Sequence, residues 1–182
     1  MKSLCVAAMG AIDLEVLTVV EQALGSWFRA PVRRLPLPEP DFAFDAARGQ
    51  YGSVPVLRHL VGSRPAYGAK LLGLTVKDLF IPMLTFVFGQ AQLAGDVAVV
   101  SLARLSQEFY GMPSDRALLA ARARKEALHE TGHMFGLVHC RERTCVMSLA
   151  TNVRHLDAKG LGFCASCAQQ VEQRSIGRSR EV

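Results

Sequence analysis

The 182-residue sequence predicts an α/β protein of the α+β kind, with a mixed sheet, several helices and a small irregular C-terminal lobe. Short apolar runs alternate with helix-spaced apolar residues in the first half of the chain. A segment near residues 115–135 is rich in alanine, leucine and arginine, which are strong helix formers. Four of the five cysteines then fall between residues 140 and 167. We expect one domain over residues 1–182, with an upper lobe (1–137) and a metal-braced lobe (138–182) on either side of a cleft.

The elements follow in order from local signals. Strands are expected over residues 3–9, 31–37, 69–76, 86–90 and 96–102. Asp13 can cap a first helix whose apolar residues recur every three or four positions as far as Trp27 or Phe28. Further helices are expected over residues 53–61, from a cap at Ser114 or Asp115 to about residue 135, and after Cys167 to about residue 173. Prolines at positions 31, 36, 38 and 40 favour a sheet edge for the second strand, with a linker over residues 38–45.

Composition narrows the class of protein. Half of the residues are hydrophobic, 20% are charged and no run of five like charges occurs, so most of the chain should be folded. The net charge of +5 permits acidic partners but is common on soluble surfaces. The N-terminal apolar run is too short for a secretory signal, and no stretch reaches the eighteen apolar residues of a membrane span. We therefore expect a cytoplasmic location, where clustered cysteines are metal ligands more often than disulfides.

The segment from His129 to Cys140 reads H-E-T-G-H-M-F-G-L-V-H-C. Helical residues four apart differ by about 40° in azimuth and about 6 Å in rise, so His129 and His133 project from one face and can bind one metal ion. Gly136 can take a positive φ and end the helix, which lets the chain turn back and bring His139 to the same ion. Three neutral imidazoles leave a fourth position open for water, which is typical of a catalytic zinc.

Glu130 supplies the chemistry that such a site needs. Zinc on neutral nitrogens lowers the pKa of a bound water to about 7, and it can polarise a carbonyl and stabilise an oxyanion. Glu130 can take a proton from that water and pass it to a leaving amine. The expected reaction is hydrolysis of a peptide bond or a similar amide. The full motif should arise by chance in roughly one chain in 10⁵ of this composition, which disfavours unrelated surface histidines.

The remaining cysteines form a second candidate metal site, made of Cys140, Cys145, Cys164 and Cys167. Two close pairs, the second spaced C-x-x-C, suit a closed structural zinc, whereas two disulfides or free buried thiols are the alternatives. Because Cys140 follows His139, a closed zinc site would fix the backbone that carries the third histidine. Cations at positions 141, 143, 154 and 159 could offset the thiolate charge. No ligand role is expected for His59, His155 or Cys5, and Met147 could form an apolar floor under the histidines.

H-E-x-x-H-x-x-G-x-x-H followed by a methionine resembles the metzincin metallopeptidases. The added cysteines make the chain similar to the archaemetzincins, a family with this bimetallic arrangement. The resemblance is strongest over residues 129–167. It extends upstream through L-T-V-K-D-L-F, V-F-G-Q-A and V-A-V-V-S-L-A-R-L, and more weakly through F-D-A-A-R-G-Q-Y, so it covers most of the chain.

The resemblance implies a zincin fold, with a mixed twisted sheet over an active-site helix, and two zinc ions per chain. The structural ion would lie on the four cysteines, Met147 would be the Met-turn residue and Glu130 the general base. The catalytic ion would lie on His129, His133 and His139. By analogy, the strand near residues 96–102 would be the edge that pairs with an extended substrate.

Two departures from the family pattern affect these expectations. Sixteen residues separate Met147 from Cys164, one fewer than usual, which a loop could absorb. Position 149 is leucine, where some metzincins place a tyrosine that assists the transition state. Oxyanion stabilisation would then come from elsewhere or be weak.

Two other functions compete with a zinc metallopeptidase. A zinc-ribbon-like nucleic-acid-binding module would explain the cysteines and the positive charge, but the chain lacks an aromatic or basic stripe, and such a module does not need Glu130. A metzincin-like zinc protein with little or no turnover would differ only in its kinetics. We expect a peptide or protein substrate, a monomer, and no nucleic-acid or membrane partner.

Overall fold

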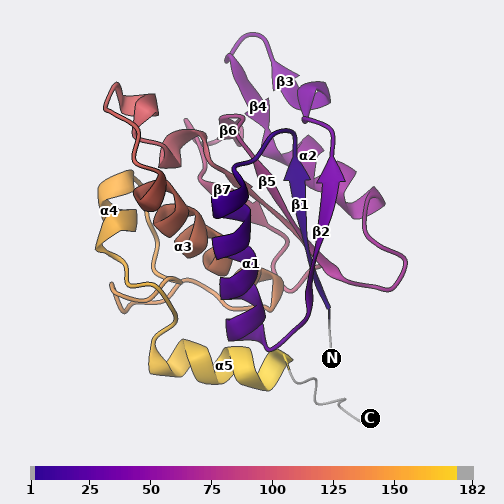
Figure 1. Ribbon diagram of the computed structural model, residues 1–182, viewed down its shortest axis with the longest axis vertical. Coiled ribbons are helices and arrows are strands. Elements are labelled where there is room, and N and C mark those ends of the chain that lie inside the picture. Colours follow the sequence, from indigo (N-terminus) through magenta and orange to yellow (C-terminus); the bar gives the residue numbers. More distant parts are fainter. Residues whose placement is uncertain (1–2, 176–182) are drawn as a thin grey trace.

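A five-stranded sheet of order β2-β1-β5-β8-β7 forms the centre of the molecule in the computed structural model, which describes residues 3–175 (Figure 1). Its strands are β1 (Leu4–Met9), β2 (Val32–Leu37), β5 (Lys70–Thr75), β7 (Gly89–Ala91) and β8 (Val97–Ser101). The first four in this order are parallel, and β7 runs antiparallel to β8. The mixed sheet and all five predicted strands are confirmed, although the strand predicted over residues 86–90 is shorter and begins later.

Five α-helices accompany the sheet within residues 3–175: α1 (Leu14–Phe28), α2 (Ser53–Gly62), α3 (Arg116–Met134), α4 (Val153–Ala158) and α5 (Ala165–Ser175). Asp13 caps α1 and Asp115 caps α3, since each side chain accepts a hydrogen bond from a backbone N–H of the first turn. The last helix begins two residues before Cys167, so the expected start after that cysteine was wrong. The sequence also gave no sign of α4, because a six-residue helix is too short to show a periodic apolar face.

The two faces of the sheet bury two separate apolar cores. Alternate strand residues point to opposite faces, which explains why neighbours in sequence belong to different cores. The face covered by α1 and α3 includes Leu4, Val6, Leu72, Leu74, Ala98 and Val100. The face covered by α2 includes Cys5, Ala7, Met9, Leu71, Val97 and Val99. Figure 1 shows α1 and α3 side by side in front of the sheet, with α5 crossing below α1.

A small second sheet, of order β3-β4-β6, extends the upper part of the molecule (Figure 1). Its strands are β3 (Phe44–Asp45), β4 (Gln50–Gly52) and β6 (Leu79–Phe80). The linker expected over residues 38–45 therefore contains a strand and a 3₁₀ turn (Asp41–Ala43). Strands of two or three residues are too short to show alternation, and β3 turns into β4 where the Asp45 carboxylate accepts hydrogen bonds from the Ala47 and Arg48 N–H groups.

At the end of the sheet opposite β2, the open edge is β7, not β8. We expected the strand near residues 96–102 to be the edge, and this was wrong, because β8 lies between β5 and β7. Every residue of β8 is buried, as is usual for an interior strand covered on both faces. The opposite edge, β2, exposes Arg33 and Arg34 and contains Pro36, features that discourage edge-to-edge pairing.

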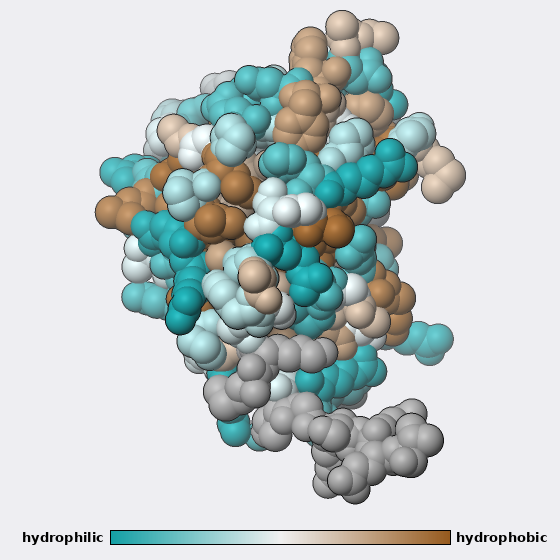
Figure 2. Space-filling model, turned by 90° about the vertical axis from the view of Figure 1, so that its right-hand side faces the viewer, coloured by the Kyte–Doolittle hydropathy of each residue, from teal (hydrophilic) through white to brown (hydrophobic). Residues whose placement is uncertain are grey.

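Within residues 3–175, no helix combines the length and the apolar character that a bilayer crossing requires. On the side of the molecule shown in Figure 2, polar and apolar side chains are interspersed.

Candidate active site

The C-terminal end of α3 is closed by a glycine turn. Gly136 has a φ of 84°, its N–H donates to His133 O at 2.8 Å, and the Leu137 N–H donates to Gly132 O at 3.0 Å. These two bonds form a Schellman motif, in which the glycine takes the left-handed conformation that a Cβ would oppose. The chain therefore reverses after α3 and brings His139 back toward the helix, as the sequence predicted.

Three imidazoles meet at this turn. The candidate ligand atoms of His129, His133 and His139 lie within 4.8 Å of one another, and the Nε2 atoms of the first two are 3.1 Å apart. The Nδ1 atoms of His129 and His133 face backbone carbonyls at 2.8 Å (Val146 O) and 2.7 Å (Leu137 O). A carbonyl only accepts hydrogen bonds, so each Nδ1 carries the proton and each Nε2 has a free lone pair. Three converging nitrogen donors fit zinc.

Burial keeps these imidazoles neutral. Loss of solvation lowers the pKa of His129 well below its usual range, and the nearby Lys159 cation adds to the effect. The pKa values of His133 and His139 are also lowered, mainly by burial. Neutral imidazole is the form that binds a metal ion, so the surroundings favour ligation over protonation.

Glu130 lies in the same cleft with its carboxyl group against Gly89 of β7. A Cβ atom at position 89 would lie 2.6 Å from Glu130 Cγ and 2.7 Å from Glu130 Oε1. Burial raises the pKa of Glu130 well above its usual range, and the Glu126 carboxylate raises it further. A carboxyl group whose pKa is raised holds a proton more readily than an ordinary carboxyl group, which suits a general base.

Gly89→Ala should impair catalysis without removing metal. The new Cβ would displace the Glu130 carboxyl group. A misplacement of about 1 Å in an active site costs about 10²-fold in rate. We expect kcat/KM for a peptide substrate to fall by about that factor, with zinc content and thermal midpoint unchanged. A variant with wild-type kcat/KM would show that Glu130 does not need this space.

Met147 packs beneath α3. It is fully buried, and a Cβ added at Gly132 would lie 2.5 Å from its Sδ and 3.3 Å from its Cε. Gly132 therefore allows the methionine to approach the helix between His129 and His133. The role of Met147 as an apolar floor under the histidines stays a prediction.

Gly132→Ala should destabilise the protein even though alanine is the better helix former. Overpacking of this kind costs about 1–3 kcal/mol, which exceeds the propensity gain of about 1 kcal/mol. The free energy of unfolding, measured in denaturant, should fall accordingly. Gly62→Ala in α2 is a matched control, because nothing lies within 4 Å of its added Cβ. Equal effects of the two changes would contradict this account.

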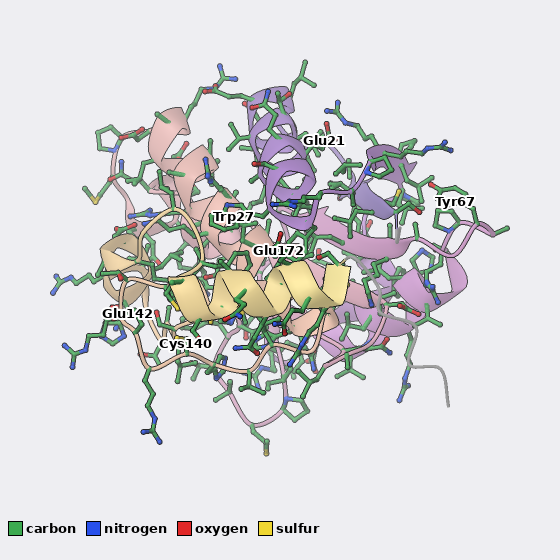
Figure 3. The ribbon with its side chains drawn as sticks, turned by 90° about the horizontal axis from the view of Figure 1, so that it is seen from below. Glu21, Trp27, Tyr67, Cys140, Glu142 and Glu172 are labelled. Carbon is green, nitrogen blue, oxygen red and sulfur yellow. The ribbon has the colours of Figure 1, made fainter. Side chains whose placement is uncertain are left out.

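The four cysteines Cys140, Cys145, Cys164 and Cys167 converge on a second centre. Their sulfur atoms lie within 4.8 Å of one another, and Cys140 Sγ is 3.8 Å from Cys164 Sγ. Four sulfurs in a tetrahedron at the Zn–S distance of about 2.3 Å would be about 3.8 Å apart, so the spacing fits zinc. All five cysteines of the chain are free thiols, which removes the disulfide alternative. Figure 3 shows Cys140 beside one end of α5.

Local surroundings shift the pKa values of three of these thiols in different directions. Burial raises the pKa values of Cys145 and Cys167, whereas a backbone N–H of Cys167 lowers the pKa of Cys164. The raised pKa values of Cys145 and Cys167 make these two thiols costly to ionise without a cation. Zinc binding would therefore displace protons, and the affinity would weaken as the pH falls.

The two centres are joined through the backbone. The Cys140 N–H donates to Met147 O at 2.9 Å, and Cys140 also forms a β-bridge with Ser148. The segment that delivers His139 is thus tied to the segment that follows Cys145. A metal on the cysteines would hold both segments together.

A cleft of about 550 Å³ contains the histidines and Glu130. Its walls come from β7, α3, the loop over residues 81–88 and the segments after Gly136 and Met147. Leu149 lines the cleft where a tyrosine could have offered a hydroxyl, and its side chain is exposed. The departure noted from sequence is therefore located at the cleft itself.

Other residues lie where the sequence could not place them. His59 and His155 belong to neither cluster, as expected. Lys159, one of the cations suggested for the cysteine site, lies with its Nζ 3.0 Å from Val146 O and 3.6 Å from Glu126 Oε1. Gly89, Glu126 and Lys159 were missed as site residues, since only the folded chain brings them together.

Neutral imidazoles, a buried carboxyl group and an open sheet edge around one cleft define the class of protein as a zinc metallopeptidase. The model of peptidase family M54 matches residues 43–173, and the chain belongs to that family. Its relatives are archaemetzincins. The archaemetzincin of Methanocaldococcus jannaschii is 36% identical over 95% of this chain and 94% of its own length, and that of Pyrococcus furiosus is 37% identical over 95% and 93%.

Solved structures agree with the sequence relatives. The archaemetzincin from Methanopyrus kandleri superimposes with a TM-score of 0.86 at 36% identity, covering 97% of this chain and 96% of that one. A zinc-dependent peptidase from Methanocorpusculum labreanum gives a TM-score of 0.85 at 33% identity, with 93% and 100% covered. The expected family, the zincin fold and the zinc metallopeptidase class are confirmed. The histidine and cysteine clusters could bind two zinc ions.

Proposed function

We propose that this chain hydrolyses peptide bonds with Glu130 as general base and with a catalytic zinc on the three clustered histidines. A second zinc, on the four cysteines, has a structural role. The observation that carries the proposal is the position of Glu130: its buried carboxyl group shares one cleft with the three imidazoles and packs directly on the edge strand β7.

The histidines, Glu130 and strand β7 have separate roles in the proposed reaction. A zinc ion held by His129, His133 and His139 would supply a Lewis acid and would lower the pKa of a water bound to it. His129 and His133 keep their Nε2 lone pairs free by donating Nδ1–H to backbone carbonyls. Glu130 accepts a proton at its carboxylate and later donates it to the leaving amine. The open edge of β7 hydrogen-bonds the backbone of an extended substrate.

The cleft favours apolar substrate side chains near the scissile bond. Exposed apolar residues from four separate segments line it: Leu84, Leu93, Val138 and Leu149. Burying such surfaces against a peptide supplies binding energy roughly in proportion to the apolar area covered. Met147 acts as the Met-turn residue under the histidines. A cytoplasmic location, a monomeric state, the division into two lobes and the lack of nucleic-acid or membrane partners remain predictions.

Metal analysis and a peptide library test this proposal together. We expect two zinc ions per chain and cleavage of peptides that carry apolar residues beside the cut. Leu149 favours the second candidate, a zinc protein with little turnover, because it cannot donate a hydrogen bond to an oxyanion. Two bound zinc ions with no cleavage across the library would support that second candidate and reject the first.

A further inference from the structure

A buried Lys–Glu pair lies beneath the candidate active site. Lys159 follows α4 and is contributed by the C-terminal part of the chain, whereas Glu126 lies on α3 one turn before His129. Their side chains are only 1% and 4% exposed, and Lys159 Nζ is 3.6 Å from Glu126 Oε1. That oxygen has no hydrogen-bond partner among the described residues. A buried ion pair with such a long contact contributes little stability. Another contact should therefore account for the burial of Lys159.

That contact is the carbonyl of Val146. Lys159 Nζ donates to Val146 O at 3.0 Å, and His129 Nδ1 donates to the same oxygen at 2.8 Å. A carbonyl oxygen has two lone pairs, and here both are occupied by side-chain donors. The other helical histidine differs, since the carbonyl that receives His133 Nδ1 has no second side-chain donor in the described part of the chain.

The segments that carry the lysine and the carbonyl are also paired. The Gly160 N–H donates to Thr144 O at 2.7 Å, and the Val146 N–H donates to Gly162 O at 3.0 Å. Cys145 lies between the two residues of the first segment that make these contacts. Lys159 is therefore placed where the cysteine-bearing segment, the helix α3 and the first histidine meet.

We propose that Lys159 is a positioning residue for His129, which it holds by fixing the Val146 carbonyl. The proposal rests on the proposed role of His129 as a zinc ligand and extends it to a residue outside the motif. With the carbonyl fixed, the imidazole of His129 keeps its Nδ1–H tautomer and its Nε2 stays directed toward the other two histidines. Loss of a group that orients a metal-binding histidine typically costs about 10–100-fold in metal affinity.

The test compares Glu126→Gln with the double variant Glu126→Gln/Lys159→Met. The first change removes the ion pair but leaves Lys159 on the carbonyl, and the second removes the lysine donor without leaving Glu126 as an unpaired buried charge. Zinc affinity of the histidine cluster is measured by chelator competition on protein that keeps its cysteine-bound zinc. Cobalt substitution at the histidine cluster gives a visible spectrum that reports ligand geometry independently of turnover.

We expect Glu126→Gln to stay within about 3-fold of wild type and the double variant to lose a further 10–100-fold, with a changed cobalt spectrum. When Lys159→Met in the double variant is replaced by Lys159→Arg, which keeps a cationic donor, most of the zinc affinity lost in the double variant should be restored. Equal affinities in Glu126→Gln and the double variant would overturn the proposal, as would a full loss in Glu126→Gln alone. Wild-type protein that binds zinc at the histidines but cleaves no peptide would reject the proposed function and leave this inference standing.

Discussion

Replacing Glu130 with glutamine should abolish peptide hydrolysis while both metal centres keep their zinc. The change removes the carboxyl group that packs on β7 beside the three imidazoles, and glutamine cannot take up a proton. A positioned general base typically contributes about 10²–10⁴-fold to the rate, so kcat/KM should fall by at least about 10²-fold. Steady-state kinetics on the best library peptide would measure the loss.

Glutamine nearly matches the size of glutamate, so zinc content and thermal midpoint serve as internal controls for the Glu130 variant. The removal of a buried carboxyl group whose pKa is raised by loss of solvation should not destabilise the fold. Hydrolysis that persists at the wild-type rate would assign the base to another group and contradict the mechanism.

Cys140→Ser should weaken the catalytic zinc although no catalytic ligand is changed. The Cys140 N–H bonds Met147 O at 2.9 Å and its sulfur lies 3.8 Å from Cys164 Sγ, so it links the cysteine centre to the segment that carries His139. Serine is a poor zinc ligand, and without a closed cysteine centre this segment loses its anchor. We expect the affinity of the histidine cluster for zinc to fall by about 10–100-fold, measured by chelator competition.

Cys5→Ser is the matched control for that experiment. Cys5 is also a buried thiol, but it lies in the core between the sheet and α2, remote from both clusters. The Cys5→Ser change should lower the free energy of unfolding without changing the zinc affinity of the histidine cluster. Unchanged affinity in Cys140→Ser would show that the two centres are independent.

The parts of the site that the sequence predicted are local. His129 and His133 share a helix face by spacing alone, Gly136 ends the helix because its φ is positive, and His139 follows at a fixed short distance. Asp13 and Asp115 cap their helices through the same short-range geometry. These features depend on the backbone within one or two turns, so a pattern of residues is enough to predict them.

The parts that the sequence missed depend on contacts between distant segments. Gly89 matters because Glu130 lies against it, and Lys159 matters because it meets Val146 and Glu126 in the fold. The edge strand was misassigned because β7 has only three residues, whereas β8 carries the stronger apolar signal of an interior strand. Neither error could be corrected from spacing alone.

Stepwise removal of zinc tests the central claim most directly, since the claim assigns catalysis to one metal centre and structure to the other. A chelator is titrated into two-zinc protein while zinc release, peptide hydrolysis and circular dichroism are followed together. The account predicts that the first equivalent released abolishes hydrolysis and leaves the fold intact, and that the fold is lost only with the second. Hydrolysis that survives the first release, or unfolding that accompanies it, would contradict the account.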